Sequence, residues 1–112
     1  MGISTHVLDT SAGRPATRVH VTLERQTPGE GWTTVAAATT GDDGRVSSLA
    51  AGEELEPGRY RIGFDTGAYF AASGAHAFFP AVEIVFEIAD ADDHYHVPLL
   101  LSPFGYTTYR GS

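Results

Sequence analysis

Three segments of the chain alternate apolar and polar residues with a period of two. In the first, Val19, Val21 and Leu23 alternate with polar side chains, and Tyr60–Phe64 and Val82–Ile88 repeat the pattern. Such alternation is typical of a β-strand with one buried face and one face in water. Because strands of this kind are characteristic of antiparallel sheets, we expect an antiparallel β-sheet.

Turn signals separate these segments and divide the rest of the chain into short strands. Gly41–Gly44 is a tight turn, Pro57-Gly58 is a second, and Thr10–Pro15 is expected to be a loop. The alternation and the turns predict about eight strands, at Ile3–Asp9, Arg18–Arg25, Thr33–Thr39, Arg45–Ser48, Arg59–Asp65, Ala81–Ile88, His94–Ser102 and Gly105–Arg110. The alanine-rich segment Gly67–Gly74 is expected to form one short helix. Many short strands with one helix at most predict an all-β sandwich.

Size and charge restrict the function classes that are open to this chain. Its 112 residues predict one domain, spanning residues 1–112. The net charge of -7, with no lysine, argues against binding to nucleic acid or to anionic lipid. There is no cysteine, no signal-peptide pattern at the N-terminus and no apolar run long enough for a membrane span. We therefore expect a cytoplasmic protein without nucleic-acid or membrane partners.

Histidines near the two ends of the chain are the first candidates for chemistry. His94 and His96 are two residues apart, so on a strand they share one face, with Tyr95 pointing the other way. This spacing alone favours ordinary polar surface, with a general acid/base site and a metal site as alternatives. A metal site would need a third ligand, which His6 could supply if the fold brings the two termini together. His20 and His76 gain no role from their positions.

Two further features are open to more than one interpretation. Arg45 directly follows the Asp42-Asp43-Gly44 turn, where it could grip a carbonyl-rich or anionic ligand or simply pair with a neighbouring aspartate. The chain ends on Tyr109-Arg110-Gly111-Ser112 without a floppy tail. This end is either docked against the fold or a plain edge strand that is blunted by its own charge.

Three motifs carry a resemblance to a known family. The C-terminal segment, HYHVPLLLSPFGYTTYRGS (residues 94–112), resembles the C-terminal signature of the 5-hydroxyisourate hydrolases, which belong to the transthyretin-related family. Its Tyr-Arg-Gly-Ser ending separates these hydrolases from hormone-carrying transthyretins. Ser4–Thr10, followed by Gly13–Ala16, resembles the N-terminal signature, and Thr40–Arg45 is similar to the middle motif that delivers an arginine. The resemblance covers essentially the whole chain.

The resemblance implies a fold, an assembly and an activity. The fold is a transthyretin-like sandwich of two four-stranded sheets with one short helix, assembled as a homotetramer (a dimer of dimers). The activity is hydrolysis of 5-hydroxyisourate to 2-oxo-4-hydroxy-4-carboxy-5-ureidoimidazoline in urate degradation, by histidine-activated water without a metal or other cofactor.

The resemblance also implies roles for individual residues. The catalytic set is His6, Arg45, His96 and Ser112, with His94 as a secondary candidate. Arg45, Tyr109, Arg110 and Ser112 are expected to bind substrate. His96 is the expected base, because the pKa of a neutral imidazole suits deprotonation of water near neutral pH.

Three other functions remain in competition with this one. The first is a transthyretin-like carrier of a small ligand without catalysis, although a carrier has no need for this set of histidines and arginine. The second is a zinc-dependent hydrolase that uses His6, His94 and His96. The third, a purely structural sandwich, leaves all three motifs unexplained.

Overall fold

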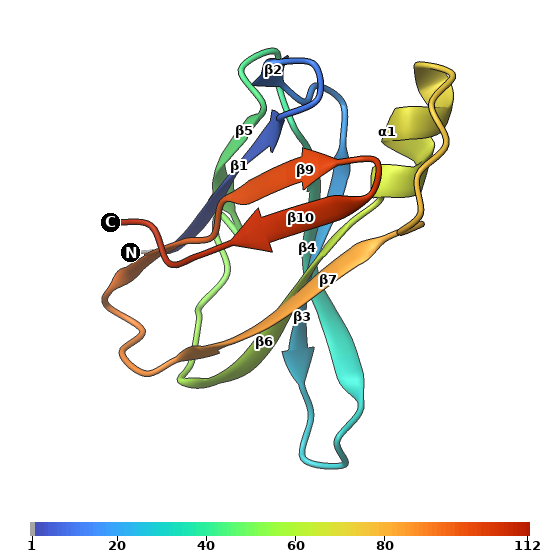
Figure 1. Cartoon of the computed structure of the whole chain (residues 1–112). Helices are drawn as coiled ribbons and strands as arrows, with labels where there is room; N and C mark the ends of the chain where they lie inside the picture. Colours follow the sequence, from blue (N-terminus) through green and yellow to red (C-terminus); the bar gives the residue numbers. More distant parts are fainter. Residues whose placement is uncertain (1) are drawn as a thin grey trace.

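The computed structural model describes residues 2–112 and consists of two β-sheets packed face to face, with a single α-helix at one end (Figure 1). One sheet contains four antiparallel strands in the order β4-β3-β6-β7. Their bounds are β3 His20–Gln26, β4 Trp32–Thr39, β6 Gly58–Phe64 and β7 Val82–Ile88. The predicted class, an all-β sandwich with one short helix, is confirmed.

The second sheet is arranged around β1, Gly2–Asp9. Along one edge β1 pairs with β5 (Arg45–Leu49) and then with the two-residue strand β2 (Arg14–Pro15). Along the other edge it pairs with β8 (His94–His96) and β9 (Leu99–Ser102), and β10 (Gly105–Thr108) pairs with β9. Six segments therefore fill the four positions that a four-stranded sheet would have.

Several details of the sequence prediction are wrong in this second sheet. β1 runs parallel to β8 and β9, so the sheet is mixed and not antiparallel. The strand expected at His94–Ser102 is interrupted at Val97-Pro98, because proline has no N–H to donate to a neighbouring strand. The loop expected at Thr10–Pro15 contains β2, and the last strand ends at Thr108 instead of Arg110.

The core lies between the sheets and is built from the alternating segments. Val21 and Leu23 of β3 and Tyr60 and Ile62 of β6 are fully buried, and Leu99 of β9 meets them from the second sheet. The predicted burial of the apolar face of each alternating segment is confirmed. The strand expected to begin at Arg18 begins at His20, because Arg18 has a positive φ of 59° that is incompatible with extended backbone.

The helix α1, Thr66–Ala72, lies where the alanine-rich segment predicted it. The Asp65 side chain caps its first turn by accepting a hydrogen bond of 3.2 Å from the Ala68 N–H, and Phe70 anchors it in the core. Within residues 2–112, no helix has the length and apolar character needed to cross a membrane.

Candidate active site

Three adjacent strands carry the candidate site on the face of the β1 sheet that points away from the core. On β1, Ser4 and His6 share this face, while Ile3 and Val7 point into the core. Ser4 pairs with His96 of β8 on one edge of β1, and His6 pairs with Arg45 of β5 on the other. Residues from both ends of the chain and from its middle thus become neighbours.

The histidines of β8 are held by a serine of β1. The Ser4 hydroxyl oxygen lies 2.8 Å from His94 Nε2 and 2.8 Å from His96 Nδ1. His96 is half-buried, whereas His94 is exposed. The predicted common face of His94 and His96, opposite the buried Tyr95, is confirmed.

A tight turn positions His6 and Arg45. His6 Nε2 lies 2.9 Å from the Asp43 carbonyl oxygen, and a carbonyl only accepts, so this ring nitrogen donates the hydrogen bond. The Asp43 carboxylate accepts a hydrogen bond of 3.0 Å from the Arg45 backbone N–H. Gly44 has φ +76°, and a Cβ atom there would meet the Val7 carbonyl oxygen at 2.5 Å, so the turn requires glycine.

The C-terminal end of the chain is docked against His96. Gly111 forms a β-bridge with His96 and donates its N–H to the His96 carbonyl oxygen at 2.8 Å. A Cβ atom at Gly111 would lie 2.4 Å from Cδ2 of the imidazole, so only glycine allows the chain to pass this close to the ring. Of the two interpretations of the chain end, docking is the one that the structure bears out, and it brings Ser112 to the site.

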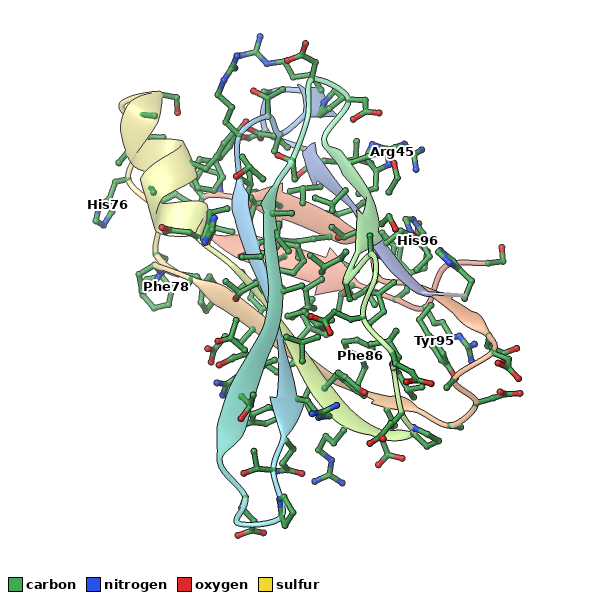
Figure 2. The ribbon with its side chains drawn as sticks, turned by 180° about the vertical axis from the view of Figure 1, so that it is seen from behind. Arg45, His76, Phe78, Phe86, Tyr95 and His96 are labelled. Carbon is green, nitrogen blue, oxygen red and sulfur yellow. The ribbon has the colours of Figure 1, made fainter. Side chains whose placement is uncertain are left out.

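These side chains surround an open pocket of about 280 Å³. Arg45, His94, His96 and Ser112 line it together with Ser4, Thr5 and Ser47. Figure 2 shows Arg45 and His96 on the same side of the molecule. Four of the residues named from the sequence therefore meet in one place, and His6 lies at the margin, beside Arg45.

Tyr109 and Arg110 lie elsewhere, around a smaller and mainly apolar cavity of about 210 Å³ on the other side of His96. The Arg110 guanidinium stacks over the ring of Tyr95 at 4.7 Å, and Phe86 forms part of the wall. Their predicted contact with substrate stays a prediction, since the structure places them around this apolar cavity and not along the pocket.

The pKa of His96 is lowered from its usual 6.5. Burial is the largest cause, because it disfavours the charged ring, and the positive charge of Arg45 and of the neighbouring histidines His6 and His94 lowers the pKa further. A neutral imidazole next to an arginine is chemically suited to the addition of water to a carbonyl group. The imidazole accepts the proton of the water, and the guanidinium stabilises the oxyanion.

The lowered pKa of His96 predicts the pH dependence of the site. A base works only when it is unprotonated, so any activity that depends on His96 should fall as the pH drops through a pKa below 6.5. The charged and titratable groups that act on His96 are Arg45, His6 and His94, and the NMR titration of each ring separates His96 from the other two histidines. An acid limb of kcat/KM above 6.5, or a His96 titration above that value, would contradict this prediction.

Comparison with known proteins places these features in a family. The HIUase/Transthyretin family matches residues 3–111, which is nearly the whole chain. The chain belongs to this family.

The relatives of this chain within the HIUase/Transthyretin family include both 5-hydroxyisourate hydrolases and a transthyretin. The 5-hydroxyisourate hydrolase of Salmonella typhimurium is 46% identical over 110 residues, covering 98% of this chain and 80% of the relative. The solved structure of the Klebsiella pneumoniae 5-hydroxyisourate hydrolase aligns with a TM-score of 0.85 at 40% identity, covering 98% of this chain and 92% of the other. Sea bream transthyretin in complex with thyroxine aligns with a TM-score of 0.92 at 34% identity, covering 99% and 95%.

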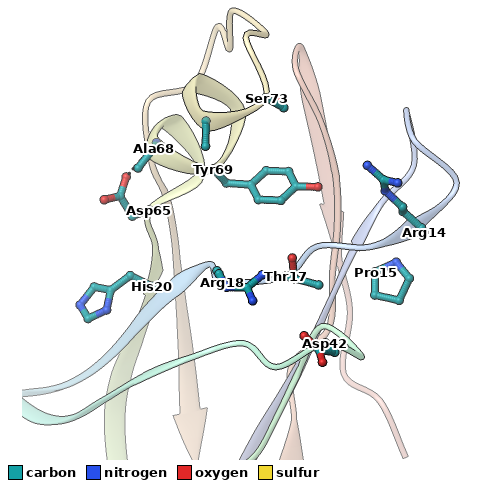
Figure 3. A pocket seen from close by; sticks show the side chains of 11 residues that line it. Arg14, Pro15, Thr17, Arg18, His20, Asp42, Asp65, Ala68, Tyr69 and Ser73 are labelled. Carbon is teal, nitrogen blue, oxygen red and sulfur yellow. Dashed lines mark hydrogen bonds between the residues drawn. The ribbon is translucent and has the colours of Figure 1, made fainter.

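A larger cavity of this HIUase/Transthyretin family member, about 540 Å³, lies away from the histidine pocket, between α1 and the β2–β3 connection (Figure 3). Arginines and aspartates both line it, so charges of opposite sign face one another there. Burial, together with a 2.7 Å hydrogen bond to Asp9, raises the pKa of Tyr69 to about 12, so this phenol stays protonated and committed to Asp9. The volume of a cavity alone therefore does not identify the candidate active site.

The zinc alternative has its three histidines on neighbouring strands, but one ring nitrogen of each already has another partner. His94 Nε2 and His96 Nδ1 both face the Ser4 hydroxyl, and His6 Nε2 faces a carbonyl oxygen. Across residues 2–112, no group of three or more His, Cys, Asp or Glu side chains is arranged to hold a metal ion.

Sequence reasoning assigned no role to three residues that line the pocket, Thr5, Ser47 and Ser4, and of these Ser4 contacts the histidines. Ser4 was noted only as part of the N-terminal motif, without a role. Its position two residues before His6 places both side chains on one strand face, which is a signal that the sequence contains. Its contact with His94 and His96 depends on the parallel pairing of β1 with β8, some 90 residues away, which no local pattern predicts.

Proposed function

We propose that this chain hydrolyses 5-hydroxyisourate, opening its six-membered ring. The observation that carries the proposal is the pocket in which Arg45, His96 and Ser112 come together from three distant parts of the chain. Its volume of about 280 Å³ lies just below the range of roughly 300–1,000 Å³ for small-molecule sites, which suits a small heterocycle. Identities of 40–46% to 5-hydroxyisourate hydrolases support this activity over that of a carrier.

The proposed mechanism uses only side chains of the pocket. Unprotonated His96 takes a proton from water, and the hydroxide adds to a ring carbonyl of the substrate. The Arg45 guanidinium holds the oxygen that becomes negatively charged. The carbon–nitrogen bond then breaks, and the ring nitrogen takes the proton back from His96. The former carbonyl carbon becomes a carboxylic acid, which loses its remaining proton to solvent as the carboxylate forms. Ser112 completes the polar wall beside the water, and His6, whose charge acts on His96, orients the water or moves protons.

The carrier function remains as the second candidate because of one specific observation. The fold aligns more closely with thyroxine-bound sea bream transthyretin, at a TM-score of 0.92, than with the Klebsiella hydrolase, at 0.85. The backbone therefore does not discriminate between the two functions. The imidazole and guanidinium groups of the pocket favour catalysis, because a carrier needs no base.

A coupled assay tests the proposal directly. Urate oxidase generates 5-hydroxyisourate in situ, and ultraviolet absorbance follows its decay with and without the protein. We expect the decay to accelerate in proportion to protein concentration, with or without a chelator. No acceleration by folded protein would leave the carrier as the better proposal, and full loss of activity with a chelator, restored by zinc, would contradict the metal-free mechanism.

The same family resemblance leads us to propose a homotetramer, a dimer of dimers. Two edge strands support it: β7 and β10 each have one unpaired edge within residues 2–112, and they expose Val85 and Tyr106. We expect a tetramer mass by light scattering at micromolar concentration, and a monomer mass would contradict the proposal. A cytoplasmic location stays a prediction.

A further inference from the structure

Ser4 contacts both histidines of β8 through one hydroxyl group. Its Oγ lies 2.8 Å from His94 Nε2 and 2.8 Å from His96 Nδ1, and Ser4 is only 9% exposed, so water has little access to these bonds. A hydroxyl group carries one proton, so it donates one hydrogen bond while its oxygen accepts others. The two ring nitrogens therefore play opposite roles: one accepts from Ser4 and the other donates to it.

The proposed function distinguishes the two arrangements. His96 Nδ1 is the ring nitrogen that contacts the Ser4 hydroxyl oxygen, so Nε2 is the nitrogen that remains for the pocket. A general base must have an unprotonated nitrogen. With His96 as that base, the neutral ring carries its proton on Nδ1, which donates to the Ser4 oxygen, and Nε2 is left unprotonated.

The hydroxyl proton of Ser4 is then directed at His94. Since the oxygen of Ser4 accepts from His96 Nδ1–H, its own O–H donates to His94 Nε2. This nitrogen of His94 is occupied as an acceptor, so the neutral His94 ring carries its proton on Nδ1. His94 thereby orients the hydroxyl, while His96 keeps a free basic nitrogen.

We propose that Ser4 is a positioning residue that holds His96 as its Nδ1–H tautomer, with Nε2 free to act as the general base of the pocket. This inference rests on the proposed hydrolase function, because a base is needed only where water is activated. It assigns the acid/base role to His96 and not to His94. Without the serine hydroxyl, the ring loses the acceptor that selects this tautomer, and a ring protonated on Nε2 cannot take a proton from water.

Three serine variants test the proposal. Ser4→Ala removes the bridge, Ser4→Thr keeps a hydroxyl at the same position, and Ser48→Ala makes the same chemical change at an exposed position on β5 outside the pocket. We expect Ser4→Ala to lower kcat on the order of 10-fold with little change in KM, as is usual for residues that orient a catalytic group. Ser4→Thr should restore most of the activity, and Ser48→Ala should match the unmodified protein.

Nitrogen NMR of the imidazole rings shows which ring nitrogen of His96 carries the proton. A purely structural role of Ser4 would leave this unchanged. In the unmodified protein the neutral His96 ring should carry its proton on Nδ1, and in Ser4→Ala the population should shift toward Nε2–H. A Ser4→Ala variant with unchanged kcat and unchanged tautomer would overturn the proposal. If that variant does not fold, the unmodified protein still decides, because a His96 proton found on Nε2 contradicts the inference.

The same spectra separate this inference from the proposed function. An unmodified protein that does not hydrolyse 5-hydroxyisourate would contradict the function, whatever its tautomer. An active protein whose His96 is protonated on Nε2 would contradict the role of Ser4 alone.

Discussion

Replacing His96 by Asn should lower kcat by about 10²–10⁴-fold, which is the usual contribution of a general base. The carboxamide of asparagine can still donate a hydrogen bond toward Ser4, but it has no nitrogen that accepts a proton at neutral pH. Substrate affinity should change much less, because Arg45 and Ser112 remain in the pocket. Steady-state kinetics in the coupled assay give both quantities.

The matched control is His76→Asn, the same substitution at an exposed histidine in the loop after α1. It should leave kcat and KM unchanged. If His96→Asn kept full turnover in a folded protein, His96 would not be the base, and His6 would become the next candidate because it also borders Arg45.

Much of the fold could be predicted from the sequence because the alternating segments record one-sided burial directly. Tyr60, Ile62 and Phe64 alternate in the sequence and are buried in the structure, since a two-residue period permits only one face toward the core. The alternation does not indicate whether neighbouring strands pair in parallel or antiparallel. A strand buried on one face has the same alternation whether its neighbour runs parallel or antiparallel, and so the parallel pairing of β1 with β8 was missed.

The candidate site was predictable to a different degree for each residue. His6, Arg45, His96 and Ser112 were named from motifs, and the structure brings the last three around one pocket with His6 beside them. Tyr109 and Arg110 belong to the same terminal motif, yet their side chains turn to the apolar cavity, because the direction of a side chain beyond the last strand follows from tertiary packing. The position of Ser4 two residues before His6 indicated a shared strand face, but its contact with His94 and His96 could not be predicted, since it depends on partners on another strand.

Replacing Arg45 by Met should lower kcat by about 10²–10³-fold, the usual cost of removing one group that stabilises an oxyanion. It should also move the acid limb of the pH profile upward, because the charge of Arg45 is one cause of the lowered pKa of His96. Burial of His96 is unchanged by this substitution, so the pKa should rise only part of the way toward 6.5. A matched control is Arg59→Met, which breaks an exposed pair with Glu87 and should affect neither quantity.

Replacing Arg45 by Lys separates the two effects of the arginine. Lysine keeps the positive charge, so the pKa of His96 should stay low and the acid limb should not move. It lacks the planar fork that can hold two oxygens at once, so kcat should still fall well below that of the unmodified protein. If Arg45→Lys kept full activity, charge alone would be sufficient. If Arg45→Met left the acid limb in place, the low pKa of His96 would be due to burial and the neighbouring histidines, and Arg45 would act on the substrate only.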